Sequence, residues 1–114
     1  RWRRRLMMIE DEAVEKAADW LISNSPEAGR LRGERVHAEE YRKSLKAILA
    51  SQSPETSEGG RERWAYASSA YQEHIETMRD AVTADEVNRA RRVAAQMRIE
   101  IWRTQNANNR SVKL

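Results

Sequence analysis

Apolar residues recur along most of this chain at the three- and four-residue spacing of amphipathic helices. The first such stretch runs from about Glu10 to Ser23, and its apolar face holds Val14, Ala17, Ala18 and Leu21. The sequence Ser23-Asn24-Ser25-Pro26 predicts both the end of this helix and the start of the next. Ser25 is a favourable N-cap, and Pro26 suits the first helical position.

The second predicted helix continues to about Ser51. Its apolar positions are Leu31, Ala38, Tyr41, Leu45 and Ile48. The segment Gln52–Gly60 reads QSPETSEGG and predicts a loop. A short helical piece, Glu62–Ala67, is expected before Ser68-Ser69.

The longest predicted helix follows, because no Gly or Pro occurs between Arg61 and about Asn108. Its apolar stripe is expected to contain Tyr71, Ile75, Met78, Val82, Ala90, Val93, Met97 and Ile101. Thr83-Ala84-Asp85-Glu86 resembles a capping box and would allow a break. We favour a continuous helix because nothing around this tetrapeptide forces a turn.

These elements predict an all-α fold, with a short N-terminal helix packed on a long antiparallel helical hairpin. Residues 1–9 would form a basic arm, residues 10–110 a single helical domain and residues 111–114 a tail. Antiparallel packing would place Arg35 opposite Glu86 as a polar layer. The last third of the long helix needs a cover, either the first helix or another copy, so we expect a homo-oligomer.

Composition supports long helices and a thin core. The 114 residues are 39% hydrophobic and 34% charged, with four Gly and two Pro. There is no Cys, which suits a reducing compartment, and no apolar run approaches the ~18 residues of a membrane span. We therefore expect a cytoplasmic protein with no membrane partner.

Positive charge gathers at both ends of the chain. Residues 1–10 hold four Arg and one Glu, and residues 91–114 hold six basic residues and one Glu. Basic ends suit phosphates or an acidic partner, although charged helix faces are also ordinary solvation. The candidate binding residues are Arg3, Arg4, Arg5, Arg42, Lys43, Trp102, Arg103 and Arg110.

Trp102 has two interpretations. It could stack against a partner together with the neighbouring Arg and Asn residues, or it could close the core beneath the first helix.

Catalytic motifs are not evident. The two histidines, His37 and His74, lie in predicted helices, and no Gly-x-Ser-x-Gly elbow or phosphate loop occurs. Glu34-x-x-His37 matches half of a di-iron helical motif, but its second half is missing. We expect no catalytic site, no metal and no cofactor.

Three segments resemble a family of small helical proteins of temperate bacteriophages and prophages. These are HAEEYRKSLKAILA (37–50), WAYASSAYQEHIETMRDAV (64–82) and MRIEIWRTQNANNR (97–110). The resemblance covers most of residues 30–110, and RWRRRL lies outside it. It implies a role in phage DNA metabolism, with recombination first, in a bacterial host cell.

The expected function is therefore a non-catalytic accessory protein that binds DNA or a DNA-processing protein. One alternative is a protein–protein adaptor, or an inhibitor of a host enzyme, without nucleic-acid contact. Another is an oligomeric structural component of the virion.

Overall fold

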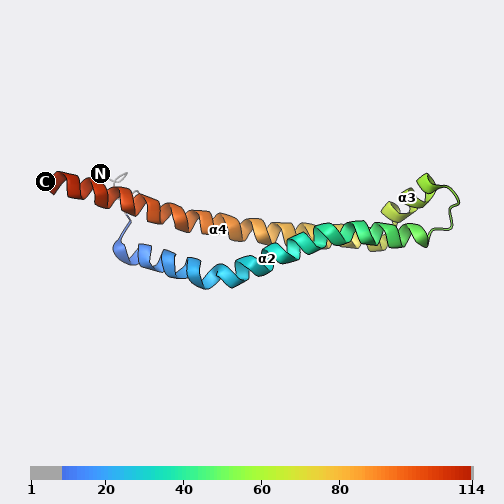
Figure 1. The fold of residues 1–114 in the computed structure, drawn as a ribbon, viewed down its shortest axis with the longest axis horizontal. Coiled ribbons are helices and arrows are strands. Elements are labelled where there is room, and N and C mark those ends of the chain that lie inside the picture. The colour runs from blue at the N-terminus through green and yellow to red at the C-terminus, as the bar shows by residue number, and fades with distance from the viewer. Residues whose placement is uncertain (1–8, 114) are drawn as a thin grey trace. The chain divides into compact units, whose positions relative to one another are not determined.

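The computed structural model describes residues 9–113, and within them it is all-α, as predicted. Its helices are α2 (Asp11–Ser51), α3 (Glu58–Ala67) and α4 (Ser69–Lys113) (Figure 1). Contacts group the described residues into two compact units. The terminal unit contains residues 9–28 and 87–113, and the central unit contains residues 29–86. The basic arm predicted at the N-terminus, with Arg3, Arg4 and Arg5, lies outside the described residues except for Ile9.

The predicted helix end at Ser23–Pro26 is wrong, because α2 continues through Pro26. Proline inside a helix removes a backbone hydrogen bond and crowds the preceding turn. The carbonyl that loses its helical partner is that of Ile22, four residues before the proline. The neighbouring Leu21 carbonyl accepts hydrogen bonds from the Ser25 hydroxyl and the Arg92 guanidinium, at 2.9 and 3.0 Å.

Helix α3 ends at Ala67, as predicted, but it begins at Glu58 and not at Glu62. Ser57 is the N-cap, and its hydroxyl accepts a hydrogen bond from the Gly60 amide at 3.0 Å. A Cβ atom at Gly60 would lie 2.8 Å from this hydroxyl oxygen. The glycine therefore lets the serine approach the first turn closely.

Helix α4 is continuous from Ser69, so the alternative break at Thr83–Glu86 does not occur. The predicted stripe is correct at its start, since Tyr71 is buried and Ile75, Met78 and Val82 are half-buried. It is wrong further on, where Ala90, Val93 and Met97 are exposed.

The inward positions of α4 follow a seven-residue repeat and include polar side chains. They are Tyr71, His74, Met78, Ala81, Asp85, Asn88, Arg92, Ala95, Ile99, Trp102 and Asn106. The same repeat runs along α2, where Tyr41 and Ile48, predicted as core, are exposed. A seven-residue repeat is the register of coiled-coil packing. At several positions, the place of a residue in this repeat, and not its hydrophobicity, therefore determines whether it faces the other helix.

In the terminal unit, α2 and α4 run antiparallel and meet through a largely polar seam. Trp102 donates its indole N–H to Asp11 at 2.7 Å. Further along, Asn24 donates to Asn88 at 3.0 Å. The buried apolar side chains of this unit are small: Val14, Ala17 and Ala95. The expected cover of α4 by Val14 and Ala17 is present, but on the polar side of α4.

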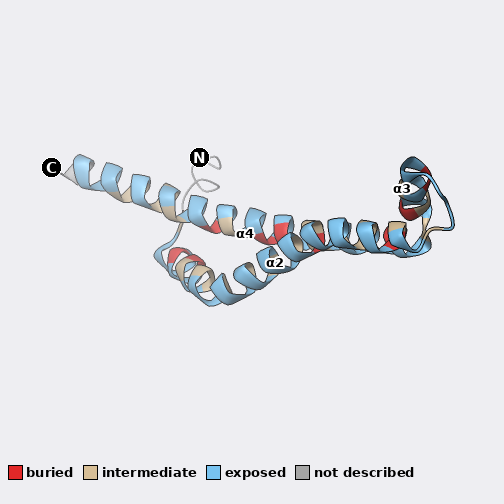
Figure 2. Cartoon of the chain, turned by 45° about the vertical axis from the view of Figure 1, so that its right-hand side comes forward, coloured by how far each residue is buried: buried red, intermediate tan, exposed pale blue. Residues whose placement is uncertain are grey.

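The central unit has a more apolar core. Leu49, Ala65 and Tyr71 form a buried cluster, against which four partly buried side chains pack: Leu45, Ala50, Trp64 and Ile75. This cluster joins α3 to both long helices. Buried residues are nevertheless few in both units (Figure 2).

Candidate binding surfaces

The outward side of α4 in the terminal unit carries a second seven-residue repeat. We call it the outer seam, and it consists of Val87, Ala90, Ala94, Met97 and Ile101. Val87 and Met97 are 47% and 58% exposed, and the neighbouring Val93 is 53% exposed. In this part of α4, three of the residues predicted as core, Ala90, Val93 and Met97, are therefore surface residues, whereas Ile101 is half-buried. The chain hides the polar Asn88 and Arg92 against α2 while it presents this apolar stripe outward.

Arginines border the outer seam on one side. Helical spacing places Arg91 and Arg98 along that border, and Glu86, Val93 and Glu100 along the other. Residues 87–104 contain five arginines and one carboxylate, Glu100, so this half of α4 is basic. An apolar stripe beside a basic border is suited to an acidic helical partner.

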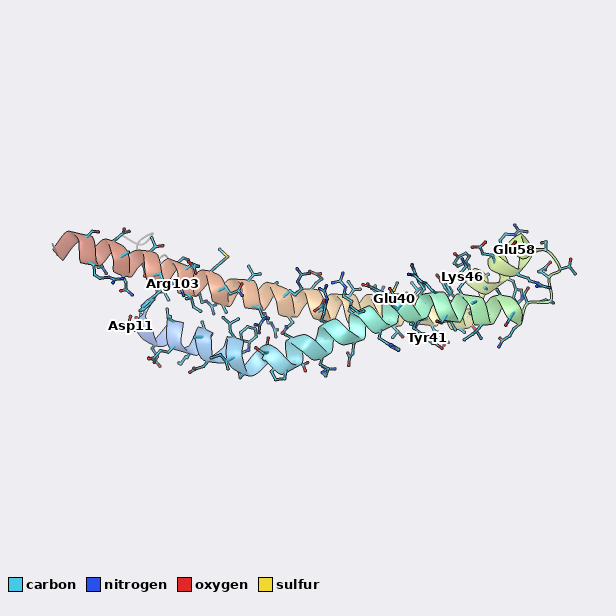
Figure 3. The ribbon with its side chains drawn as sticks, viewed as in Figure 1. Asp11, Glu40, Tyr41, Lys46, Glu58 and Arg103 are labelled. Carbon is cyan, nitrogen blue, oxygen red and sulfur yellow. The ribbon has the colours of Figure 1, made fainter. Side chains whose placement is uncertain are left out.

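The end of α4 holds three of the predicted binding residues. Trp102 is half-buried and bonded to Asp11, so it takes the position under the start of α2. Arg103 is exposed and pairs with Glu100 at 2.9 Å (Figure 3). Arg110 is exposed and donates to the Asn106 carbonyl at 3.4 Å. Both guanidinium groups are thus accessible to an anionic partner.

The other predicted residues that the structure describes lie on α2 in the central unit. Arg42 and Lys43 are both exposed, and Lys43 pairs with Glu40 at 3.5 Å. Because these residues belong to a different unit from Arg103 and Arg110, the structure does not bring them into one site.

A groove of about 540 Å³ lies between α2 and α4 within the central unit. Its walls carry His37 and Tyr41, whose rings stack at 5.9 Å, and His74, whose ring meets that of Tyr41 edge-on at 5.3 Å. Since a carbonyl oxygen can only accept, His74 donates from Nε2 to the Ala38 carbonyl at 2.7 Å. Tyr41 is 41% exposed and stands on the outward side of α2 (Figure 3).

The groove combines a floor of small residues with acidic side chains in its lining. Small residues line the floor, namely Ala38, Ala81 and Ala84, so another helix can approach closely. Two carboxylates, Glu34 and Asp80, line it with no Lys or Arg among the lining residues. Glu34 also pairs with Arg30, one turn earlier, at 2.5 Å. The groove is therefore a weakly acidic channel with an aromatic wall.

The predicted polar layer is present in the central unit. Arg35 pairs with Glu86 at 2.6 Å, as expected, and also with Asp85 at 3.2 Å and Glu39 at 2.9 Å. Bonds to Glu39, Glu86 and Asp85, in that order, raise the pKa of Arg35 above its ordinary value. Asp85 is only 2% exposed, so this cluster fixes the register of the two helices.

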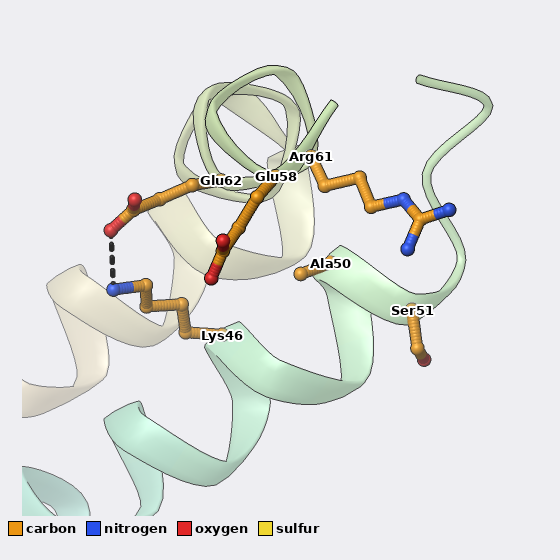
Figure 4. Close-up of a pocket in the computed structure, with 6 residues that line it drawn as sticks. All are labelled: Lys46, Ala50, Ser51, Glu58, Arg61 and Glu62. Carbon is orange, nitrogen blue, oxygen red and sulfur yellow. Dashed lines mark ion pairs between the residues drawn. The ribbon is translucent and has the colours of Figure 1, made fainter. Parts of the chain in front are cut away.

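A second hollow, of about 350 Å³, lies where α3 meets the end of α2 (Figure 4). Lys46 pairs there with Glu62 at 2.6 Å, and its ammonium lies 4.8 Å from the centre of the Tyr66 ring. The bond to Glu62, with a further one to Tyr66, raises the pKa of Lys46, and the Lys46 bond lowers the pKa of Glu62. These contacts hold α3 in place.

The histidines and carboxylates do not gather into a metal site in the part of the chain that the structure describes. No three His, Asp or Glu side chains among these residues lie close enough to share a metal ion, so Glu34 and His37 gain no further ligands there. His74 is engaged with a backbone carbonyl.

No family model, curated protein or solved structure matches this chain. In residues 9–113, no helix combines the length and the apolar character needed to cross a membrane.

Proposed function

We propose that this chain is a non-catalytic accessory protein of the phage type that binds DNA through the C-terminal end of α4. The observation that carries the proposal is the charge of that end. Beyond Glu100 the sequence holds Arg103, Arg110 and Lys113 and no carboxylate. The two arginines are exposed and lie seven residues apart, on one side of the helix.

The chemistry of this surface is that of phosphate binding. Two guanidinium groups two turns apart, about 10 Å along the helix, can contact successive phosphates of a backbone. The amide of Asn109 is exposed on the adjacent side of the helix and can bond to base edges or sugars. Such a protein would act in phage DNA metabolism, with recombination the first candidate, in the cytoplasm of the bacterial host.

Titration of single- and double-stranded oligonucleotides at two salt concentrations tests this proposal. We expect affinity that falls steeply as salt rises, because bound phosphates release counterions. The double variant Arg103→Ala/Arg110→Ala should bind more weakly and reduce the salt slope by about 2.

The matched control is Arg32→Ala/Arg63→Ala, which removes two exposed arginines of the central unit and should leave the slope unchanged. Absence of binding at low salt, or equal losses in the two double variants, would refute DNA binding through α4.

A second candidate function is a protein–protein adaptor or an inhibitor of a host enzyme. The exposure of Met97 and Val93 between arginines favours it, since Met and Arg are enriched in protein interfaces. Protein binding that survives the loss of Arg103 and Arg110, without any DNA binding, would select this function.

A further inference from the structure

We propose that the outer seam of α4 in one copy docks, as a helix, into the central-unit groove of a second copy. This contact joins two different surfaces, so it is independent of the DNA site at the end of α4. It also identifies what covers the apolar stripe that the chain leaves exposed.

The spacing of the outer seam indicates a helical partner. Successive members lie three, four, three and four residues apart, which keeps a straight apolar line on one side of a supercoiled helix. Two adjacent small residues, Ala90 and Ala94, lie between the larger Val87 and Met97 along this line. The small pair allows another helix to approach α4 closely.

The charge along one border of the seam favours an acidic partner. Arg91 and Arg98 follow this border, whereas Glu86, Val93 and Glu100 follow the other. An antiparallel contact of the seam with itself would bring the Arg91 and Arg98 borders of two copies together, and like charges across a helical interface are destabilising. An acidic surface complements the basic border instead.

The central groove supplies that surface within the same chain. Its floor of Ala38, Ala81 and Ala84 has room for larger side chains such as Met97 and Val87. Its carboxylates, Glu34 and Asp80, lie among the lining residues without any Lys or Arg. In the proposed contact they would face Arg91 and Arg98 of the other copy, in competition with Arg30, which pairs with Glu34 at 2.5 Å, and Arg79, which lies 4.0 Å from Asp80.

The groove walls have the periodicity that a docked helix requires. On α2, the groove lining includes Glu34, His37 and Tyr41, which are three or four residues apart, and the exposed Ser44 and Ile48 continue this spacing beyond the groove. Tyr41 and Ile48, at 41% and 47% exposure, are the positions where a sequence-based core assignment fails. Contact with a second copy would bury them.

The net charges of the central unit and of the C-terminal half of α4 are also complementary. The central unit, Gly29–Glu86, contains eleven acidic and nine basic residues. Residues 87–113 contain seven basic residues and one acidic residue. A contact between one copy's α4 and another's central unit is therefore attractive at long range and is weakened by salt.

Two surface variants of the full chain block the two sides separately. Met97→Glu places a carboxylate in the seam, and Ala84→Arg places a bulky cation in the groove. Both positions are exposed, so helicity measured by circular dichroism should be unchanged. Gln96→Glu and Ala47→Arg are matched controls, since both residues are exposed and lie outside the seam and the groove lining.

Sedimentation measures the association. We expect the wild-type chain and both controls to associate with increasing concentration, and each blocked variant to lose at least about tenfold in association constant. An equimolar mixture of Met97→Glu and Ala84→Arg should form a 1:1 complex, because the first retains its groove and the second its seam.

Each other outcome contradicts the proposal. If the equimolar mixture of Met97→Glu and Ala84→Arg stays monomeric, the seam-in-groove contact is refuted. Loss of association in Met97→Glu alone would indicate a symmetric α4 contact. A wild-type chain that remains monomeric at low salt would assign the seam to a different protein or to nucleic acid. None of these variants changes Arg103 or Arg110, so failure here leaves the DNA proposal to be judged separately.

Discussion

At the scale of single residues, polar side chains define how the helices meet. Arg35 binds three carboxylates, and one of them, Asp85, is only 2% exposed. In the terminal unit, Asn24 and Asn88 meet in the same way, and Asn88 Nδ2 has no further partner among the described residues. Polar contacts of this kind select one register because any slip leaves a buried group unpaired.

Replacement of Arg35 tests this dependence. Arg35→Met removes the cation next to the buried Asp85 carboxylate, so the Tm measured by thermal unfolding should fall by at least about 5 °C. Adding Asp85→Leu should recover much of the loss, because an apolar pair leaves no unpaired charge. Arg32→Met is the control on the exposed side of α2 and should change little. Equal effects of Arg35→Met and Arg32→Met would show that the layer is not structural.

At the scale of helices, the sequence predicts which segments are helical better than it predicts whether one helix continues into the next. The spacing of apolar residues and the serines that flank α3 were enough to predict an all-α chain, the end of α3 at Ala67 and an unbroken α4. The signal at Ser25-Pro26 was misleading because the same residues suit an N-cap and a helix interior. The turn before the proline is also contacted by Arg92, 66 positions later in the chain, and no local pattern reports this contact.

Pro26→Ala should stabilise the protein. Alanine restores the backbone N–H and removes the ring from the turn, so the free energy of unfolding should rise by about 1–3 kcal/mol. Urea unfolding measures the change. Pro54→Ala is the matched control in the loop between α2 and α3, where a more flexible unfolded chain should leave stability equal or up to about 1 kcal/mol lower. A loss of stability in Pro26→Ala would mean that the proline shapes a contact the helix needs.

At the scale of the whole molecule, the polar seam and the exposed apolar residues of the terminal unit lie on different sides of α4. Among the candidate binding residues, sequence reasoning found the exposed Arg103 and Arg110, because charge is visible in composition. It missed the outer seam, since Ala90 and Met97 have the pattern of a core stripe and only the register of α4 turns them outward. The seven-residue repeat, followed without regard to hydrophobicity, is the signal that would have found it.

The two units should also differ in local stability. The terminal unit buries Val14, Ala17 and Ala95, whereas the central unit buries Leu49 and Tyr71. Fewer buried apolar contacts lower the free energy of local unfolding. Amide hydrogen exchange should therefore be faster in residues 11–28 and 87–110 than in residues 29–50 and 69–86.

Salt should widen this difference between the units. Residues 9–28 carry six acidic residues and one Lys opposite the basic half of α4, so their attraction is screened as ionic strength rises. The core around Tyr71 is apolar and should respond little. Mass-spectrometric hydrogen exchange at low and high salt, at a protein concentration below self-association, measures both units in one experiment. Uniform exchange along α4, or a salt response confined to the central unit, would contradict the assignment of a polar seam to one unit and an apolar core to the other.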